Sequence, residues 1–295
     1  MFRLKGPLLL ACNHPNSFLD AIILCTLFNQ PVYSLARGDA FGKAWARKIL
    51  HRLKIYPVYR IREGAQNLNE NYVTFEICRK IFAENGIVLI FSEGLCENEW
   101  HLRPLKKGTA RLAISSWQQG IPLKVLPVGL NYSSFKRFGK NLDIRFGNVF
   151  GESIIEGCNT EGKALLTFNN HLHNELKNLV FEIEENDVEM QAKVFTHPLS
   201  PIEKTLLAVP AFFGLITHYP LYALWNATAG KKAYATGHYD SVMVGGLVLL
   251  YPVYLCVVGM ALAFATRQAW YGLLVFILPL LAKSLVKYRS CCTQS

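Results

Sequence analysis

The sequence lacks the patterns that mark several classes of protein. Its eight cysteines include no Cys-x-x-Cys pair, which argues against a zinc ribbon, and their scatter argues against a disulfide framework. Charged residues make up only 18% of the chain and aromatic residues 12%, a composition that excludes an intrinsically disordered protein. No basic run is interleaved with aromatics, so we expect no nucleic-acid partner. No Gly-x-Ser-x-Gly motif occurs, which counts against a serine hydrolase.

The charges that are present are unevenly placed. Residues 201–295 hold seven Lys and Arg against two Asp and Glu, and residues 1–200 hold 24 against 19. Two stretches of 26 residues, 205–230 and 241–266, contain no charged residue, whereas a membrane-crossing helix needs only about 20 apolar residues. We therefore expect residues 205–295 to form a membrane-associated helical region. The basic balance favours membrane lipids and a phosphorylated substrate as partners.

The apolar stretches of this region differ in what interrupts them. Residues 205–230 contain Pro210 and Pro220, which argue against a regular spanning helix, so we expect an interfacial or re-entrant segment. Residues 241–266 and 268–286 follow one another closely enough to form an antiparallel hairpin. The alternative is that all three stretches cover the soluble domain as an apolar layer on one leaflet. If the first stretch does not cross, the positive-inside rule groups four cations on the catalytic, cytoplasmic side: Lys231, Lys232, Lys287 and Arg289.

The first 196 residues alternate short apolar runs with longer amphipathic ones. Helix candidates at about 18–29, 40–53, 65–84 and 108–118 separate runs that have the length of buried strands. This alternation predicts an α/β domain over residues 1–196, with a mixed or mostly parallel sheet flanked by helices, followed by a linker at 197–204. The strands are expected at Leu8–Cys12, Val32–Ala36, Ile55–Val58, Ile87–Phe91 and Val125–Leu130.

Two finer expectations concern the end of this domain. Pro127 lies inside the last expected strand, and because proline cannot donate to a sheet ladder, that strand is expected at an edge or a rim. A helical stripe of apolar residues from Leu165 to Ile183 predicts one long helix, from about Glu161 to Lys193.

The most informative segment surrounds His14. The histidine follows the first strand, and Asp20 stands six positions later in the first turn of a helix. One interpretation is a dyad in which Asp20 accepts a hydrogen bond from one ring nitrogen, so that the other nitrogen of His14 can take a proton from an alcohol. The other is structural, because Ser17 and Asp20 fit a helix capping box. The two interpretations are compatible.

Further candidate residues follow two other strands. Glu93 and Gly94 end the strand at 87–91, and three cations then precede a Gly-Thr helix start, where free backbone N–H groups favour an anion. Arg60 lies just past the strand at 55–58, and an arginine fork suits a phosphate. A solvated basic loop and an ordinary surface arginine are the alternatives. The three cations are Arg103, Lys106 and Lys107.

The order of these segments resembles the phospholipid/glycerol acyltransferase family, which includes bacterial lysophosphatidate acyltransferases. Asn13-His14 with Asp20 is similar to the family's His/Asp block, and Tyr56-Pro57-Val58-Tyr59-Arg60 to its Ile-Pro-Val-x-Arg block. Phe91-Ser92-Glu93-Gly94 resembles the Phe-Pro-Glu-Gly block and Leu126-Pro127-Val128-Gly129 the fourth. Five residues separate His14 from Asp20 where most members have four, a spacing similar to that of fungal-type glycerol-3-phosphate/dihydroxyacetone-phosphate acyltransferases.

The resemblance implies a glycerol-3-phosphate acyltransferase-like fold and an activity. The activity is acyl transfer from a thioester, acyl-CoA or acyl carrier protein, to a hydroxyl of glycerol 3-phosphate or 1-acylglycerol 3-phosphate, without metal or cofactor. It implies His14 and Asp20 as the catalytic pair, and acceptor binding by Arg60, Glu93, Gly94, Arg103, Lys106 and Lys107. An acyl-ester hydrolase and a non-catalytic membrane lipid-binding protein are the alternatives.

Overall fold

The computed structural model describes residues 5–59, 65–196 and 199–291. The chain divides into two compact units. The first unit consists of Met1–Pro15, Asp20–Asn131 and Ile144–Glu182. The second unit consists of Asn16–Leu19, Tyr132–Asp143 and Ile183–Ser295, so it takes four residues from the segment that follows the first strand.

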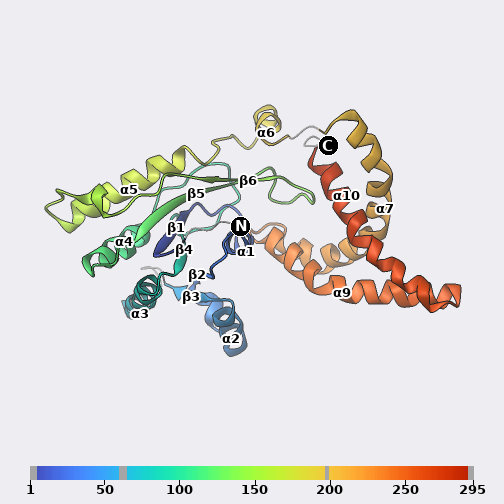
Figure 1. The fold of residues 1–295 in the computed structure, drawn as a ribbon, viewed down its shortest axis with the longest axis horizontal. Helices are drawn as coiled ribbons and strands as arrows, with labels where there is room; N and C mark the ends of the chain where they lie inside the picture. The colour runs from blue at the N-terminus through green and yellow to red at the C-terminus, as the bar shows by residue number, and fades with distance from the viewer. Residues whose placement is uncertain (1–4, 60–64, 197–198, 292–295) are drawn as a thin grey trace. The chain divides into compact units, whose positions relative to one another are not determined.

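A mixed sheet of six strands is the centre of the α/β part, in the order β3-β2-β4-β1-β5-β6 (Figure 1). Strand β1 pairs in parallel with β4 and with β5, and β2 pairs in parallel with β3 and with β4. Parallel strands buried on both faces need near-continuous apolar runs, and β1, with the sequence LLLAC, is buried at all five positions. The predicted fold class is confirmed. The strands are β1 (Leu8–Cys12), β2 (Val32–Arg37), β3 (Ile55–Val58), β4 (Ile87–Phe91), β5 (Lys124–Tyr132) and β6 (Leu142–Phe146).

The expectation that the strand carrying Pro127 lies at an edge is wrong. β5 has β1 on one side and β6 on the other, and Pro127 is in register with Ala11 of β1. The carbonyl of Pro127 accepts a hydrogen bond from the N–H of Gly147 (2.9 Å), directly after β6 ends. The nitrogen of Pro127 therefore faces a part of the chain beyond the end of β6. Because no strand residue of the described chain needs an N–H donor there, the proline leaves no sheet hydrogen bond unmade.

Helices cover both faces of the sheet. Helices α3, α4 and α5 share one buried cluster with Leu9 and Ala11 of β1 and with Val88 of β4. Because successive strand residues point to opposite faces, Leu8 and Leu10 point to the other face, and both are buried. The helices of the first part are α1 (Phe18–Leu27), α2 (Ala44–Arg52), α3 (Ala65–Ala83), α4 (Gly108–Gln118) and α5 (Glu161–Lys177).

The long helix predicted to reach Lys193 is wrong in its second half. Helix α5 ends at Lys177, and α6 (Val188–Phe195) is a separate helix. The side chain of Asn131, at the end of β5, donates to the carbonyl of Leu179 (2.9 Å) and accepts from the N–H of Phe181 (2.8 Å). These two bonds hold the chain in a non-helical path, so a contact from a distant strand overrides the local periodicity.

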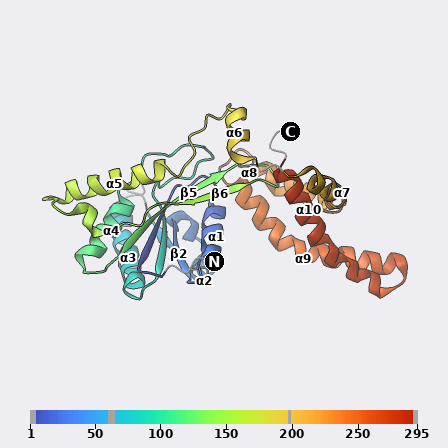
Figure 2. The same ribbon diagram turned by 45° about the horizontal axis from the view of Figure 1, so that its top comes forward.

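The second unit contains three helical segments long and apolar enough to cross a membrane: Pro201–Ala233, Tyr239–Thr266 and Ala269–Ser290. They comprise α7 (Pro201–Trp225) with α8 (Lys231–Ala233), α9 (Tyr239–Thr266), and the 3-10 segment η5 (Ala269–Ile277) with α10 (Leu278–Ser290), as Figures 1 and 2 show. Helix α7 begins inside the segment expected to be a linker, because Ser200 and Glu203 form a capping box at its start.

The two prolines of α7 do not break it. Pro210 and Pro220 both lie inside the continuous helix Pro201–Trp225. The hydroxyl of Tyr254, from α9, donates to the carbonyl of Thr217 in the turn before Pro220. A neighbouring helix that bonds a backbone carbonyl near a proline is the usual reason that apolar helices tolerate the residue. The prolines therefore do not interrupt the helix, and the interfacial or re-entrant placement of residues 205–230 stays a prediction.

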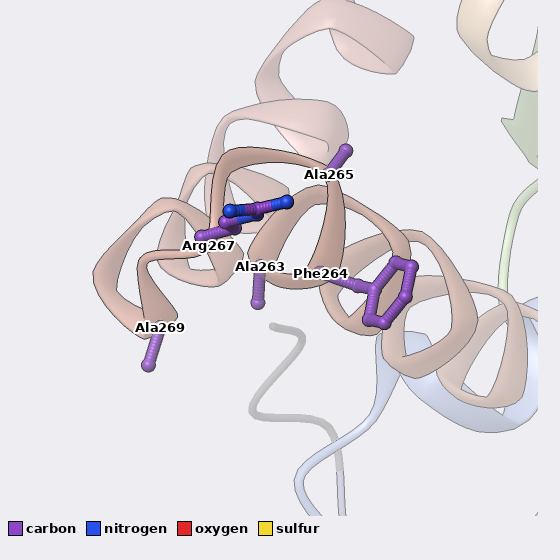
Figure 3. A pocket seen from close by; sticks show the side chains of 5 residues that line it. All are labelled: Ala263, Phe264, Ala265, Arg267 and Ala269. Carbon is purple, nitrogen blue, oxygen red and sulfur yellow. The ribbon is translucent and has the colours of Figure 1, made fainter.

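The chain reverses direction after α9, as the expected hairpin of 241–266 and 268–286 requires. Arg267 ends α9 in the left-handed conformation (φ 54°). Arg267 lines a hollow of about 550 Å³ at this turn, together with three alanines and Phe264. Figure 3 shows these five side chains. A Cβ added to Gly259 would lie 3.3 Å from the carbonyl of Gly272, so the two arms approach closely through small residues, as in membrane helix pairs.

Candidate active site

The His14–Asp20 pair predicted from the sequence is formed. His14 follows β1 directly, and Asp20 lies in the first turn of α1. Nδ1 of His14 is 2.9 Å from Oδ2 of Asp20, whose side chain is fully buried, while the His14 side chain is 18% exposed. When Nδ1–H donates to the carboxylate, Nε2 carries the lone pair. The arrangement therefore has the geometry of a general base with an orienting carboxylate.

Two neighbours hold the strand end and the imidazole in place. The ring of His14 stacks on the ring of Phe91, with centroids 3.8 Å apart and an interplanar angle of 12°. The side chain of Asn13 joins β1 to β5, because it donates to the carbonyl of Leu130 (3.0 Å) and accepts from its N–H (2.8 Å). Sequence reasoning missed both roles, since neither Phe91 nor Asn13 differs from an ordinary residue at a strand end.

Glu93 braces the backbone around His14. Its carboxylate accepts from the N–H of His14 (2.6 Å) and from the N–H of Arg103 (2.8 Å), and only 4% of the residue is exposed. Burial raises the pKa of Glu93 to about 7, while the two backbone N–H donors act in the opposite direction. Both oxygens are thus engaged by backbone groups. Glu93 therefore ties the backbone at His14 to the backbone at Arg103.

Gly94 shapes the loop that follows Glu93. Its backbone adopts φ +65°, in the left-handed region that favours glycine. A Cβ at this position would stand 3.0 Å from Cγ of Lys106. The N–H of Lys106 in turn donates to the carbonyl of Ser92 (2.8 Å). The glycine therefore lets the basic loop close against the end of β4.

The structure brings together three of the four cations expected to bind phosphate. Lys106 and Lys107 are exposed immediately before α4. Arg103 lies on the same loop, but its guanidinium is 3.3 Å from a carboxylate oxygen of Glu99 and 3.9 Å from one of Glu97. These two carboxylates were not anticipated, and they reduce the positive charge that Arg103 offers to a ligand. Arg60 lies outside the described residues.

Asn16–Leu19, between His14 and Asp20, belong to the second unit and are bonded to the start of α9. The Asn16 amide donates to Asp240 (2.7 Å), Ser17 Oγ lies 2.6 Å from His238 Nδ1, and the Leu19 N–H donates to Ser241 Oγ (3.2 Å). Ser17 has φ +55°, an uncommon conformation for a residue other than glycine. Asp240 is also ion-paired with Lys140. Sequence reasoning could not find the three partners of this segment, His238, Asp240 and Ser241, or the pairing of Asp240 with Lys140.

Comparison with known proteins identifies the domain that carries this site. Among the residues the structure describes, no three His, Cys, Asp or Glu side chains gather as a metal site would need. No curated protein matches the chain closely enough to serve as a relative. The family model described as Acyltransferase matches residues 1–131, a range that includes His14, Asp20, Glu93 and the basic loop. This match supports the predicted resemblance to the phospholipid/glycerol acyltransferase family over residues 1–131.

Proposed function

We propose that the protein transfers a fatty acyl group from a thioester, acyl-CoA or acyl carrier protein, to a hydroxyl of glycerol 3-phosphate or 1-acylglycerol 3-phosphate. The observation that carries the proposal is the contact of 2.9 Å between His14 Nδ1 and the buried carboxylate of Asp20. It orients an imidazole whose Nε2 can act as a base in a domain of acyltransferase type.

In the proposed reaction, His14 acts first as a base and then as an acid. Nε2 of His14 takes the proton of the acceptor hydroxyl while the oxygen attacks the thioester carbonyl. The tetrahedral intermediate collapses with loss of the thiolate, which takes the proton from the imidazolium, so the products are an ester and a thiol. Asp20 stabilises the imidazolium that forms between the two proton transfers. General base catalysis of this kind contributes roughly 10²–10⁴ in rate, and no step requires a metal or an organic cofactor.

The acceptor phosphate is proposed to bind at the basic loop and Arg60. Lys106 and Lys107 precede the first turn of α4, where backbone N–H groups and the helix dipole favour an anion. Arg103 is the weaker candidate because Glu97 and Glu99 lie beside its guanidinium. Glu93 and Gly94 contribute by shaping this loop.

The catalytic domain is proposed to face the cytoplasm at a membrane. The ammonium of Lys287 is 3.2 Å from a carboxylate oxygen of Glu203, so the end of α10 lies beside the start of α7. The 25 residues of α7 would extend roughly 37 Å at 1.5 Å per residue, which separates Lys231 from Lys287 by about a membrane thickness. If α7 lies in the interface, both cations share the cytoplasmic side, as the positive-inside rule favours.

Cysteine labelling in sealed membranes tests this topology. On the proposed arrangement, a cysteine at Gln268 reacts only from the far side and one at Lys231 reacts from the cytoplasm. Labelling of the cysteine at position 231 from the far side would show that α7 spans the membrane. Labelling of Gln268 only from the cytoplasm would show that all three helices lie on one leaflet.

Acyl transfer is tested with the full chain in membranes, supplied with acyl-CoA or acyl carrier protein donors. Glycerol 3-phosphate, its 1-acyl form and a lysolipid without phosphate are compared as acceptors. We expect an ester product with the phosphorylated acceptors, and its loss in His14→Ala. Release of free fatty acid without any acceptor would identify a hydrolase instead. Binding of lipid with no turnover of any donor would identify a non-catalytic protein.

A further inference from the structure

A second basic site lies in the helical unit, outside the acyltransferase domain. A hollow of about 590 Å³ is lined by cations from two segments far apart in the sequence. Lys136 and Arg137 come from the connection between β5 and β6, and Lys231 comes from α8. All three belong to the second unit. We refer to this hollow as the basic pocket.

The polar groups of the basic pocket suit a phosphate ester. The hydroxyl of Tyr239 donates to the side-chain oxygen of Asn226 (3.2 Å) and lies 3.3 Å from the hydroxyl of Tyr222. These side chains also line the pocket. Hydroxyl and amide groups next to ammonium and guanidinium groups are the donors with which proteins bind phosphate oxygens.

The positive charge of the pocket comes from two ammonium groups and one guanidinium. No carboxylate is among the described residues that line it. The acidic residue next in sequence to Tyr239 is Asp240, which is already ion-paired with Lys140. The ammonium of Lys136 lies 4.2 Å from the centre of the Tyr234 ring, a cation–π contact that holds this flexible side chain at the pocket. Among the described residues, an anion entering the pocket would therefore meet the ammonium groups of Lys136 and Lys231 beside the guanidinium of Arg137.

The position of the pocket along the chain indicates the source of the anion. It lies where α7 has ended and α9 begins, between the apolar segments Pro201–Ala233 and Tyr239–Thr266. The polar end of an apolar helix pair is at the depth of lipid headgroups when the helices contact a bilayer. We propose that the basic pocket binds the phosphate headgroup of an anionic glycerophospholipid. None of the residues that line the pocket lies within residues 1–131, the range that the acyltransferase model matches.

The test uses the full chain purified in a neutral detergent and titrated with soluble short-chain lipids. Native mass spectrometry counts bound dihexanoyl phosphatidylglycerol, with dihexanoyl phosphatidylcholine and glycerol 3-phosphate as comparison ligands. We expect preferential binding of phosphatidylglycerol. Because a basic residue near anionic lipid contributes about 1 kcal/mol, which is roughly a fivefold change in affinity, Lys231→Gln and Lys136→Gln should each weaken binding about fivefold.

Lys232→Gln is the matched control. Lys232 is the next residue on α8, is equally exposed, and does not line the pocket, so its loss should leave the affinity unchanged. An equal effect of the Lys231 and Lys232 substitutions would overturn the proposal in favour of diffuse surface attraction. Glycerol 3-phosphate is also the proposed acceptor at the basic loop, so its binding bears on the basic pocket only where it depends on Lys231. If Lys231→Gln weakened the binding of glycerol 3-phosphate as much as that of the lipid, the proposal would be overturned in favour of a soluble phosphate ligand. Equal binding of phosphatidylcholine would show that charge does not select the ligand.

Discussion

Replacing Asp20 by Asn separates catalysis from helix capping. The carboxylate of Asp20 is fully buried and 2.9 Å from His14 Nδ1. Asparagine has the same side-chain shape as aspartate, so the substitution removes only the negative charge. A hydrogen bond to a charged group is worth about 1.5–3 kcal/mol and a neutral one about 0.5–1.5 kcal/mol. At the middle of these ranges, the imidazolium formed during transfer therefore loses about 1 kcal/mol of stabilisation.

The loss in kcat should be larger than the lost stabilisation of the imidazolium alone would cause. The asparagine can also present its NH₂ group to Nδ1, which stabilises the tautomer with the proton on Nε2, and that tautomer cannot act as the base. We expect kcat to fall by a factor between about 10 and the roughly 10⁴ that a general base contributes at most. The KM values for donor and acceptor should change little, because neither the basic loop nor the acyl site is altered.

The effect on folding should be small by comparison. An acidic residue in the first turn of a helix contributes about 0.3–1 kcal/mol, so the melting temperature should fall by no more than about 4 °C. The matched control is Asp39→Asn, which removes an exposed carboxylate paired with Arg37 and should leave kcat unchanged. If Asp20→Asn keeps kcat within a factor of about three, Asp20 only caps the helix and the proposed dyad is refuted.

Three further predictions concern stability. The pKa of Glu93 is raised to about 7, so between pH 4.5 and 7 the folded chain holds a proton that the unfolded chain has lost. The free energy of unfolding should therefore fall by about 3 kcal/mol as the pH rises over that range. Denaturant unfolding at a series of pH values measures this fall, which Glu93→Gln should remove. An unchanged pH profile would contradict this. Asp240→Asn leaves the ammonium of Lys140 without its carboxylate and should cost about 3–5 kcal/mol, which adding Lys140→Gln should partly restore; no recovery would refute the pairing. Phe168→Ala empties a fully buried core position of α5 and should cost about 3–5 kcal/mol in the same unfolding measurement, whereas a loss below 1 kcal/mol would show a loosely packed site.

Much of the fold and one part of the site follow from local patterns. Apolar runs of strand length placed β1 to β5 where the structure has them, because a buried parallel strand needs a continuous apolar run. The uncharged stretches of the C-terminal third predicted the apolar helices, because a helix that crosses a membrane needs about 20 apolar residues. His14 and Asp20 are six residues apart, so a single strand-to-helix turn brings them together and the sequence alone predicts their contact.

The remaining features depend on residues far apart in the chain. Asn131 holds the chain after α5 in a non-helical conformation through hydrogen bonds to Leu179 and Phe181. Glu93 accepts a hydrogen bond from the N–H of His14, which is 79 residues away in the sequence. The bond from Asn16 to Asp240 spans 224 residues. Hydrophobic periodicity reports which face of an element is buried but not which partner buries it. Only the tertiary structure therefore decided that the turn between His14 and Asp20 is bonded to the first turn of α9, because an isolated polar residue carries no signal of its distant partner.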